Sequence, residues 1–167
     1  MVVIEATRDG RPGLATLEAS DADAVLGLFD RLSPESVYRR YFTPLARRER
    51  LRGSVARINH HDREAVAAVE GGEVVGVAEY SRVAGSRLAD MAIVVADGWQ
   101  RQGLGTRLVA ALAARAVEEG VDGFAVDIQG DNYGALRLFK RVAPGVRMTF
   151  SAGVGEAVIP LAQGENR

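Results

Sequence analysis

The sequence predicts an α/β domain of the α+β type, in which a mixed, mostly antiparallel sheet carries helices on both faces. Three observations support this prediction. Apolar runs separated by turn residues between positions 64 and 80 indicate an antiparallel hairpin. An apolar run at 91–96 leads through a glycine-rich turn into a helical pattern, and a further strand pattern follows at 123–128. Hairpins followed by a strand–helix–strand crossover predict a mixed sheet covered on both sides.

The first elements are two short strands and a helix. Apolar stretches at 2–6 and 14–19 flank a turn rich in glycine and proline. Ser20 or Asp21 is placed to cap a helix that runs from Asp23 to about Leu32. Its apolar positions recur at helical spacing and predict one buried face.

Two further helices are expected before the hairpin. Ser33-Pro34-Glu35 combines a capping residue, a proline at the first helical position and an acid in the first turn. This helix should stop near Thr43-Pro44. An arginine-rich segment from Ala46 to Ile58 also reads as a helix with its apolar residues turned inward.

The remaining elements follow the same signals. Gly71-Gly72 separates the two strands of the hairpin, and Gly120 ends the long helix that follows the glycine-rich turn. The expected strands are 65–69, 74–80, 88–95, 123–128, 147–151 and 156–161, with a turn at 152–155, and the expected helices are 104–119 and 132–141.

Composition narrows the range of functions. The 167 residues carry a net charge of −1, so neither a nucleic acid nor a membrane surface is an expected partner. No apolar run approaches the roughly 20 residues of a membrane span, and the N-terminus does not resemble a secretion signal. The absence of cysteine excludes disulfides and an acyl-cysteine intermediate. We expect one domain over residues 1–167, located in the cytoplasm.

The segment Gln100-Arg-Gln-Gly-Leu-Gly-Thr106 is the most informative motif. Glycines between a strand and a helix let the backbone approach an anion, and the first helical turn directs free N–H groups toward it. No Gly-Lys-Ser/Thr follows, and Leu108 stands where a dinucleotide-binding motif has its third glycine. A tight turn without a ligand is the alternative interpretation.

The spacing Gln-x-x-Gly-x-Gly resembles the acyl-CoA pyrophosphate loop of the GNAT acetyltransferase superfamily. Three blocks make the resemblance specific, namely 32–42, 74–80 and 89–105, which recur in this order in the catalytic domain of bacterial Pat-type protein lysine acetyltransferases. The likeness extends from about Arg11 to Leu161. It implies a GNAT fold, with a central sheet that is splayed in the middle, and acetyl-CoA as co-substrate.

The resemblance also implies positions for the coenzyme. Backbone amides across the loop would bind the pyrophosphate with help from the helix dipole. The edge of the preceding strand would pair with the pantetheine arm, where an N–H would also hold the thioester carbonyl and the oxyanion. Asn132 stands where the family often has an asparagine near the pantetheine, although it is equally well placed to cap its helix. These residues are Ile93, Val94, Val95, Arg101, Gln102, Gly103, Leu104, Gly105, Thr106 and Asn132.

Transfer to an amine requires a route for its proton. Bringing a lysine amine of pKa about 10.4 to the neutral form at pH 7 costs roughly 4.6 kcal/mol, and direct transfer to an ordinary aspartate is uphill by about 9 kcal/mol. Asp90 stands where the Pat-type family has a glutamate, and Glu79 on the neighbouring strand is a second candidate. A base at Asp90 must be partly buried, act through water, or receive an amine that is already neutral. A solvated carboxylate without a catalytic role is the alternative.

One position departs from the family. Many GNAT enzymes have a tyrosine acid where this chain has Phe139, so the thiolate would leave unprotonated or take a proton from water. Without cysteine, direct attack in a ternary complex is the simplest mechanism.

No metal site is expected, because neighbouring His60 and His61 would point apart on a regular element.

The leading hypothesis is an acetyl-CoA-dependent N-acetyltransferase acting on a primary amine, most plausibly a protein lysine. An acyl-CoA synthetase is one candidate acceptor. A small-molecule amine acetyltransferase and a catalytically silent acyl-CoA-binding module are the two alternatives. The sequence leaves the oligomeric state open.

Overall fold

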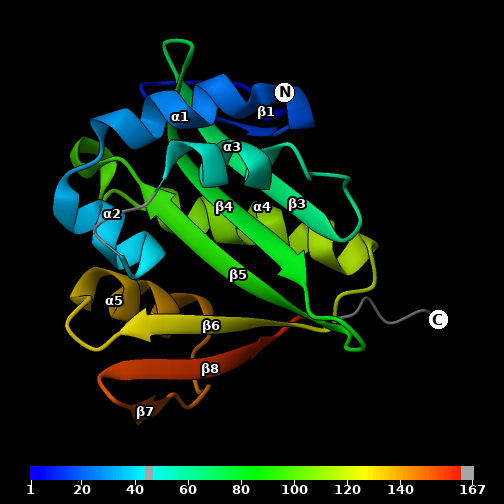
Figure 1. The fold of residues 1–167 in the computed structure, drawn as a ribbon, viewed down its shortest axis with the longest axis vertical. Helices are drawn as coiled ribbons and strands as arrows, with labels where there is room; N and C mark the ends of the chain where they lie inside the picture. The colour runs from blue at the N-terminus through cyan, green and yellow to red at the C-terminus, as the bar shows by residue number, and fades with distance from the viewer. Residues whose placement is uncertain (44–46, 163–167) are drawn as a thin grey trace.

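A computed structural model describes residues 1–43 and 47–162 of the chain. The residues form an eight-stranded sheet with helices on both faces (Figure 1). In chain order the elements are β1 (Val2–Glu5), β2 (Gly13–Thr16), the 3-10 turn η1 (Ala19–Asp21), α1 (Ala22–Arg31), α2 (Pro34–Tyr41), α3 (Arg48–Val55), β3 (Arg63–Glu70), β4 (Glu73–Arg82), β5 (Leu88–Val95), the 3-10 turn η2 (Asp97–Trp99), α4 (Leu104–Glu118), β6 (Gly123–Gln129), α5 (Tyr133–Val142), β7 (Thr149–Ser151) and β8 (Val154–Pro160).

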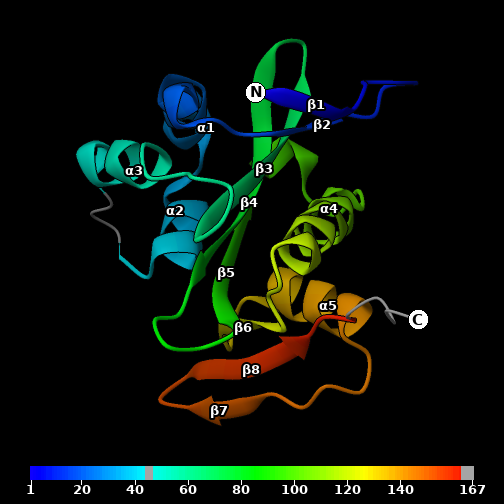
Figure 2. The ribbon, with the colours of Figure 1, turned by 90° about the vertical axis from the view of Figure 1, so that its right-hand side faces the viewer.

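The strands lie in the order β1-β2-β3-β4-β5-β6-β8-β7. Every neighbouring pair is antiparallel except β5 and β6, which α4 connects as a crossover. Helices α1, α2 and α3 lie on one side of the sheet and α4 and α5 on the other (Figure 2). The predicted mixed, mostly antiparallel sheet with two covered faces is therefore confirmed.

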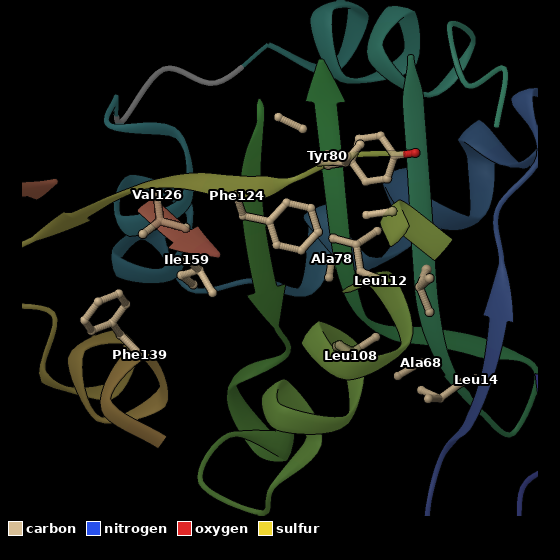
Figure 3. Packing of buried hydrophobic residues seen from close by; sticks show 14 of the residues in the cluster. Leu14, Ala68, Ala78, Tyr80, Leu108, Leu112, Phe124, Val126, Phe139 and Ile159 are labelled. Atoms are coloured by element: carbon tan, nitrogen blue, oxygen red, sulfur yellow. The ribbon is translucent and has the colours of Figure 1, made fainter. Parts of the chain in front are cut away.

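Each face of the sheet has its own hydrophobic core. Leu108 and Leu112 of α4 pack with Phe124 of β6, and Phe139 of α5 extends this cluster toward β8 (Figure 3). On the opposite face, Leu28 of α1 lies in a second cluster with residues of α3, β3 and β4. The two cores hold the central strands rigid between the helical layers.

The sheet opens between β5 and β6. Parallel pairing covers only Leu88↔Gly123, Ala89↔Phe124 and Asp90↔Ala125, although β5 continues to Val95 and β6 to Gln129. Beyond Asp90 the two strands diverge (Figure 1). The expected splay in the middle of the sheet is therefore present, and the second half of β5 has one edge without a strand partner.

The boundaries differ from the predictions in a few places. The third helix begins at Arg48 rather than Ala46, and Pro44 and Ala46 lie outside the described residues. A capping box between Glu18 and Asp21 forms the turn η1, so neither Ser20 nor Asp21 caps α1 with its side chain. The last hairpin turns at Ala152-Gly153, which both have positive φ, and β8 therefore starts earlier than predicted.

None of the helices in the part of the chain that the structure describes is long and apolar enough to cross a membrane.

Candidate active site

The glycine-rich turn presents the N-terminus of α4. Gly103 precedes the helix with φ of 81°, a left-handed conformation that favours glycine. The first helical bond within α4 runs from the N–H of Arg107 to the carbonyl of Gly103 (3.3 Å). The N–H groups of Leu104, Gly105 and Thr106 precede it and so have no acceptor within the helix. An anion at this terminus would be bound by three amides and by the helix dipole.

Gly105 lets α4 approach its neighbours closely. A Cβ at this position would lie 3.1 Å from Cδ2 of Leu138 on α5 and 3.7 Å from Cδ1 of Ile93 on β5. The first contact is tighter than ordinary packing, so the Leu138 side chain would have to shift by a few tenths of an ångström to admit a larger residue. The second glycine of the motif thus positions α4 between the two arms of the splay.

Two cavities occupy the splayed region. The larger has a volume of about 880 Å³ and is lined by the glycine-rich turn, the end of β5 and the first turns of α5. The smaller, of about 350 Å³, lies along Asp90–Ile93 of β5 and 125–128 of β6. Residues common to both linings show that the cavities meet; these are Arg39, Arg40, Ile93, Asn132, Ala135 and Leu138.

Most of the residues predicted to bind the coenzyme line the larger cavity, namely Ile93, Val94, Val95, Arg101, Gly103, Gly105, Thr106 and Asn132. Two do not line it. The Leu104 side chain is buried in the core, and the Gln102 amide donates to the carbonyl of Gly98 (2.9 Å). For these two residues, only the backbone amides are placed to contribute to the loop.

The backbone of β5 offers amides to the opening. The N–H of Ala96 donates to Val75 on β4 (2.9 Å), and peptide groups alternate along a strand. The N–H of Val94 therefore faces β4, whereas those of Ile93 and Val95 face the side where β6 has diverged. The Gln100 side chain already donates to the carbonyl of Val95 (3.0 Å), so Ile93 presents the freer peptide edge where the two cavities meet.

Asp90 and Glu79 lie on the same face of the sheet. Glu79 pairs with Ala92 and Ser81 with Asp90, so the two acids are diagonal neighbours on adjacent strands. Asp90 is exposed and lines the smaller cavity. Glu79 is held instead by the Arg40 guanidinium of α2 at 2.5 Å. A proton taken up by Glu79 would disrupt that ion pair.

Arg40 also contacts an aromatic side chain behind the ion pair. Its guanidinium lies 4.6 Å from the ring centroid of Tyr41, which packs edge-on against Phe29 of α1. Burial raises the pKa of the Tyr41 hydroxyl, with Arg40 opposing the shift and Glu79 adding to it. Tyr41 therefore stays neutral and packs between Arg40 and Phe29.

A hydrogen-bonded cluster ties α2 to the end of β5. Asp97, just after β5, accepts from the backbone N–H of Ser33 (3.0 Å), the Ser33 hydroxyl (2.8 Å) and the Ser36 hydroxyl (2.8 Å). Ser33 caps α2 by accepting from the Ser36 N–H, as the sequence predicted. Burial opposes ionisation of Asp97, but the hydrogen bonds from Ser33 and Ser36 outweigh it and lower the pKa of this carboxyl.

Asn132 and Phe139 are placed by α5, since Asn132 directly precedes the helix and Phe139 lies within it. The Asn132 side chain accepts from the Ala135 N–H (3.1 Å) and so caps the helix, while the residue also lines both cavities. Phe139 is buried, with 6% of its surface exposed, and lines the smaller cavity with a ring that carries no proton. Tyr133 lines the larger cavity and is exposed.

His60 and His61 bind different partners. His60 contacts Glu18 and Glu64, and His61 contacts Glu119. Within residues 1–43 and 47–162, no group of three or more such ligands is arranged to hold a metal ion.

Sequence reasoning missed several residues of the site. Arg40, Asp97 and Gln100 act through contacts that span 39 to 64 positions in the chain, except for the short Gln100–Val95 bond, and local patterns do not reveal such contacts. Asp127 lies on β6 and lines the smaller cavity, and no sequence motif includes it. Arg137 and Arg141 were detectable only as part of an i, i+4 series from Tyr133 along a helix.

Fold and site together define an acyl-CoA-dependent N-acetyltransferase. Residues 26–143 match the acetyltransferase (GNAT) family, and the chain belongs to that family. No match was found among curated proteins.

Solved structures share the fold over nearly the whole chain. The GNAT domain of S. lividans PAT is 25% identical with a TM-score of 0.81, covering 96% of this chain and 95% of that one. A phosphinothricin acetyltransferase from Sinorhizobium meliloti in complex with AcCoA is 19% identical with a TM-score of 0.72, covering 94% and 92%. The ribosomal-protein-S18-alanine N-acetyltransferase from Escherichia coli is 18% identical with a TM-score of 0.67, covering 92% and 97%.

Proposed function

We propose that this protein transfers an acetyl group from acetyl-CoA to a primary amine of a protein lysine by direct attack in a ternary complex. The observation that carries the proposal is the meeting of two cavities in the splay. One is lined by the N-terminus of α4 and the other by Asp90, and both reach Ile93. A donor and an acceptor bound in these cavities would bring their reacting atoms together at one peptide edge.

The larger cavity suits acetyl-CoA. Its volume of about 880 Å³ lies in the range of cofactor sites, and the free amides of Leu104–Thr106 suit the diphosphate. The freer edge of β5 suits the amides of the pantetheine arm, which would pair with it as a further strand. The GNAT relative from Sinorhizobium meliloti was solved with AcCoA bound, which agrees with this assignment.

The chemistry follows from the groups around Ile93. The amine nitrogen attacks the thioester carbonyl, and the N–H of Ile93 donates to the oxyanion that forms. The carbon–sulfur bond then breaks, and the coenzyme leaves as a thiolate, since Phe139 has no proton to give. A thiol pKa near 8.5 makes that departure feasible. An acceptor that arrives as an ammonium first loses one proton to solvent water, which leaves the neutral amine that attacks. After attack the nitrogen loses a second proton, and because Asp90 is exposed, this proton reaches Asp90 through water.

The acceptor side favours a cationic amine. Asp90 and Asp127 both line the smaller cavity and are both exposed, so their carboxylates attract an ammonium group before it loses its proton. The sequence resemblance to Pat-type protein lysine acetyltransferases favours a protein lysine, and the GNAT domain of S. lividans PAT is among the similar structures. A small-molecule amine is the second candidate, because about 350 Å³ is enough to enclose one.

The first experiment is calorimetry with acetyl-CoA, followed by thiol release in the presence of acceptors. We expect saturable binding and release that depends on a lysine-bearing protein, such as an acyl-CoA synthetase. Faster release with free amines than with the protein would favour the small-molecule activity. Absence of acetyl-CoA binding would refute the assignment of the glycine-rich turn.

An Asp90→Asn variant tests the base. It should lower kcat by about 100-fold, as is typical for loss of a general base, while leaving the Kd for acetyl-CoA unchanged. Glu156→Gln is the matched control, because Glu156 is an exposed acid opposite Asp127 on β8 and lines neither cavity. Equal activity of the two variants would show that Asp90 is not the base.

A further inference from the structure

The side chains that line the larger cavity carry a net positive charge, and part of it lies on α5. Its lining contains one acid, Glu35, and five arginines, Arg39, Arg40, Arg101, Arg137 and Arg141. Two of the arginines are neutralised, since Arg39 pairs with Glu35 and Arg40 with Glu79, each at 2.5 Å. Arg101, Arg137 and Arg141 make no ion pair with any acid in residues 1–43 and 47–162. These three are available to a ligand.

Two of the three unpaired arginines belong to one stripe of α5. Tyr133, Arg137 and Arg141 are spaced four residues apart, so they lie above one another on the same side of the helix. All three line the cavity that the glycine-rich turn also lines. Tyr133 is 66% exposed, which leaves its ring open to stack on a ligand. Lys140, the neighbouring cation on the same helix, does not line either cavity.

We propose that this stripe binds the adenosine 3′-phosphate end of the coenzyme and makes the enzyme selective for CoA over its 3′-dephosphorylated form. The inference rests on the proposed binding of acetyl-CoA. Arg137 and Arg141 take the 3′-phosphate, and Tyr133 stacks against the adenine.

The charge of the coenzyme supports this division. CoA has a diphosphate and, separately, a phosphate monoester on the ribose. The diphosphate is satisfied by the amides of α4 and by Arg101, which lies in the same turn. A phosphate monoester carries about −1.5 to −2 at pH 7 and binds guanidinium groups bidentately. Among the described residues of the lining, the remaining unpaired cations are those of α5.

The test compares acetyl-CoA with acetyl-dephospho-CoA by calorimetry. Wild-type protein should bind the dephospho form about 10- to 100-fold more weakly, as expected for loss of charge-assisted hydrogen bonds. Arg137→Gln/Arg141→Gln should bind both forms equally, at the weaker affinity. Lys140→Gln is the matched control and should keep the full preference. Because both arginines are exposed, the double variant should fold, and circular dichroism checks this.

The tyrosine has a separate signature. Tyr133→Ala should weaken binding of both forms by a similar factor, because both carry the adenine. An unchanged affinity for both would overturn the role of Tyr133.

The outcomes distinguish failure of the proposed 3′-phosphate site from failure of the proposed function. Equal affinity of the wild type for both forms, or full preference retained in the double variant, would overturn the stripe as the 3′-phosphate site and leave the proposed function standing. Failure of the wild type to bind acetyl-CoA at all would overturn both.

Discussion

At the scale of single residues, the two acids Glu64 and Glu79 are each matched by an arginine from a distant part of the chain. Glu64 is fully buried yet bonded by Arg115 at 3.2 Å and His60 at 3.0 Å, and Glu79 is bonded by Arg40. A buried carboxylate without such partners would be strongly destabilising. The same type of residue therefore differs in function with its surroundings: Glu64 and Glu79 are held in ion pairs, whereas Asp90 is left open to the smaller cavity.

His60 makes stability depend on pH. Its hydrogen bond to Glu18 raises the pKa of the imidazole, burial opposes this, and Glu64 adds to the rise. A raised pKa means that the full stabilisation exists below the unfolded value of about 6.5 and disappears as pH rises through the folded value. The free energy of unfolding, measured in urea, should therefore fall between pH 6 and pH 8. His60→Gln should flatten this slope. The control is His61→Gln, which replaces a side chain that is 62% exposed and should leave the slope as it is. Equal slopes in all three proteins would contradict the assignment.

Asp97 also makes stability depend on pH, but its contribution is lost as the pH falls, whereas that of His60 is lost as the pH rises. Asp97→Ala removes the acceptor of three hydrogen bonds at the start of α2 and should lower the free energy of unfolding by about 1 kcal/mol at pH 7. Because the folded pKa is lowered, this difference from wild type should persist to about pH 4 and shrink as pH falls through the folded value. Denaturant melts at pH 7 and pH 3 measure it, and a difference that does not change with pH would be inconsistent with an ionised Asp97.

At the scale of elements, the site depends on where three of them end or begin. β5 ends beside the N-terminus of α4, and α5 begins across the opening, with Gly105 setting the spacing of the two helices. The hydrogen bonds of Asp97 and Gln100 then fix α2 against the same strand. Helix termini and an unpaired strand edge leave peptide groups free by construction, so the fold supplies binding groups without extra side chains.

The glycine-rich turn can be tested with a matched pair of glycines. Gly103 and Gly85 both have positive φ, of 81° and 70°, and a Cβ would meet nothing within 4 Å at either. Glutamate at either position should therefore cost a similar conformational strain of about 1 kcal/mol. Only Gly103→Glu places a carboxylate at the proposed diphosphate site, and calorimetry should show at least 100-fold weaker acetyl-CoA binding. Equal binding by the two variants would argue against the turn as the diphosphate site.

At the scale of the whole molecule, β5 joins two parts of the sheet. On one side it pairs with β4 from Ala89 to Val95, and on the other it pairs with β6 through three residue pairs. α4 and α5 cover the join from one face and share the core of Figure 3. A ligand in the splay would touch β5, α4 and α5 together and would therefore link the two parts.

Binding should accordingly raise the melting temperature. At a concentration 100 times its Kd, acetyl-CoA should add about 2.7 kcal/mol to the free energy of unfolding. For a chain of this size, the melting temperature should rise by about 5–10 °C. Differential scanning fluorimetry measures the shift, and at the same acetyl-CoA concentration the Gly103→Glu variant should shift by no more than about 1–2 °C. An equal shift in that variant would place the ligand elsewhere.

The sequence by itself determined the elements, the fold and the family. Apolar periodicity and local signals such as Ser33-Pro34 and Gly71-Gly72 act within a few residues, so they placed most helices and strands. The glycine-rich turn is also local, because a strand, two glycines and a helix follow one another in the chain. Local signals failed in two places. They did not identify Glu18 as the capping residue of η1, and they did not identify Ala152 as a turn residue with positive φ, because many residue types can occupy such positions.

Only the tertiary structure decided which polar groups face the site. The pairing of Glu79 with Arg40, the anchoring of Ser33 by Asp97 and the divergence of β6 from β5 join residues that are far apart in the chain. The tertiary structure also showed that the Asn132 side chain caps α5. It placed Arg137 and Arg141 in the same cavity as the glycine-rich turn. Such contacts depend on how helices pack and strands register, and these are set by the summed burial of the whole core rather than by any short segment.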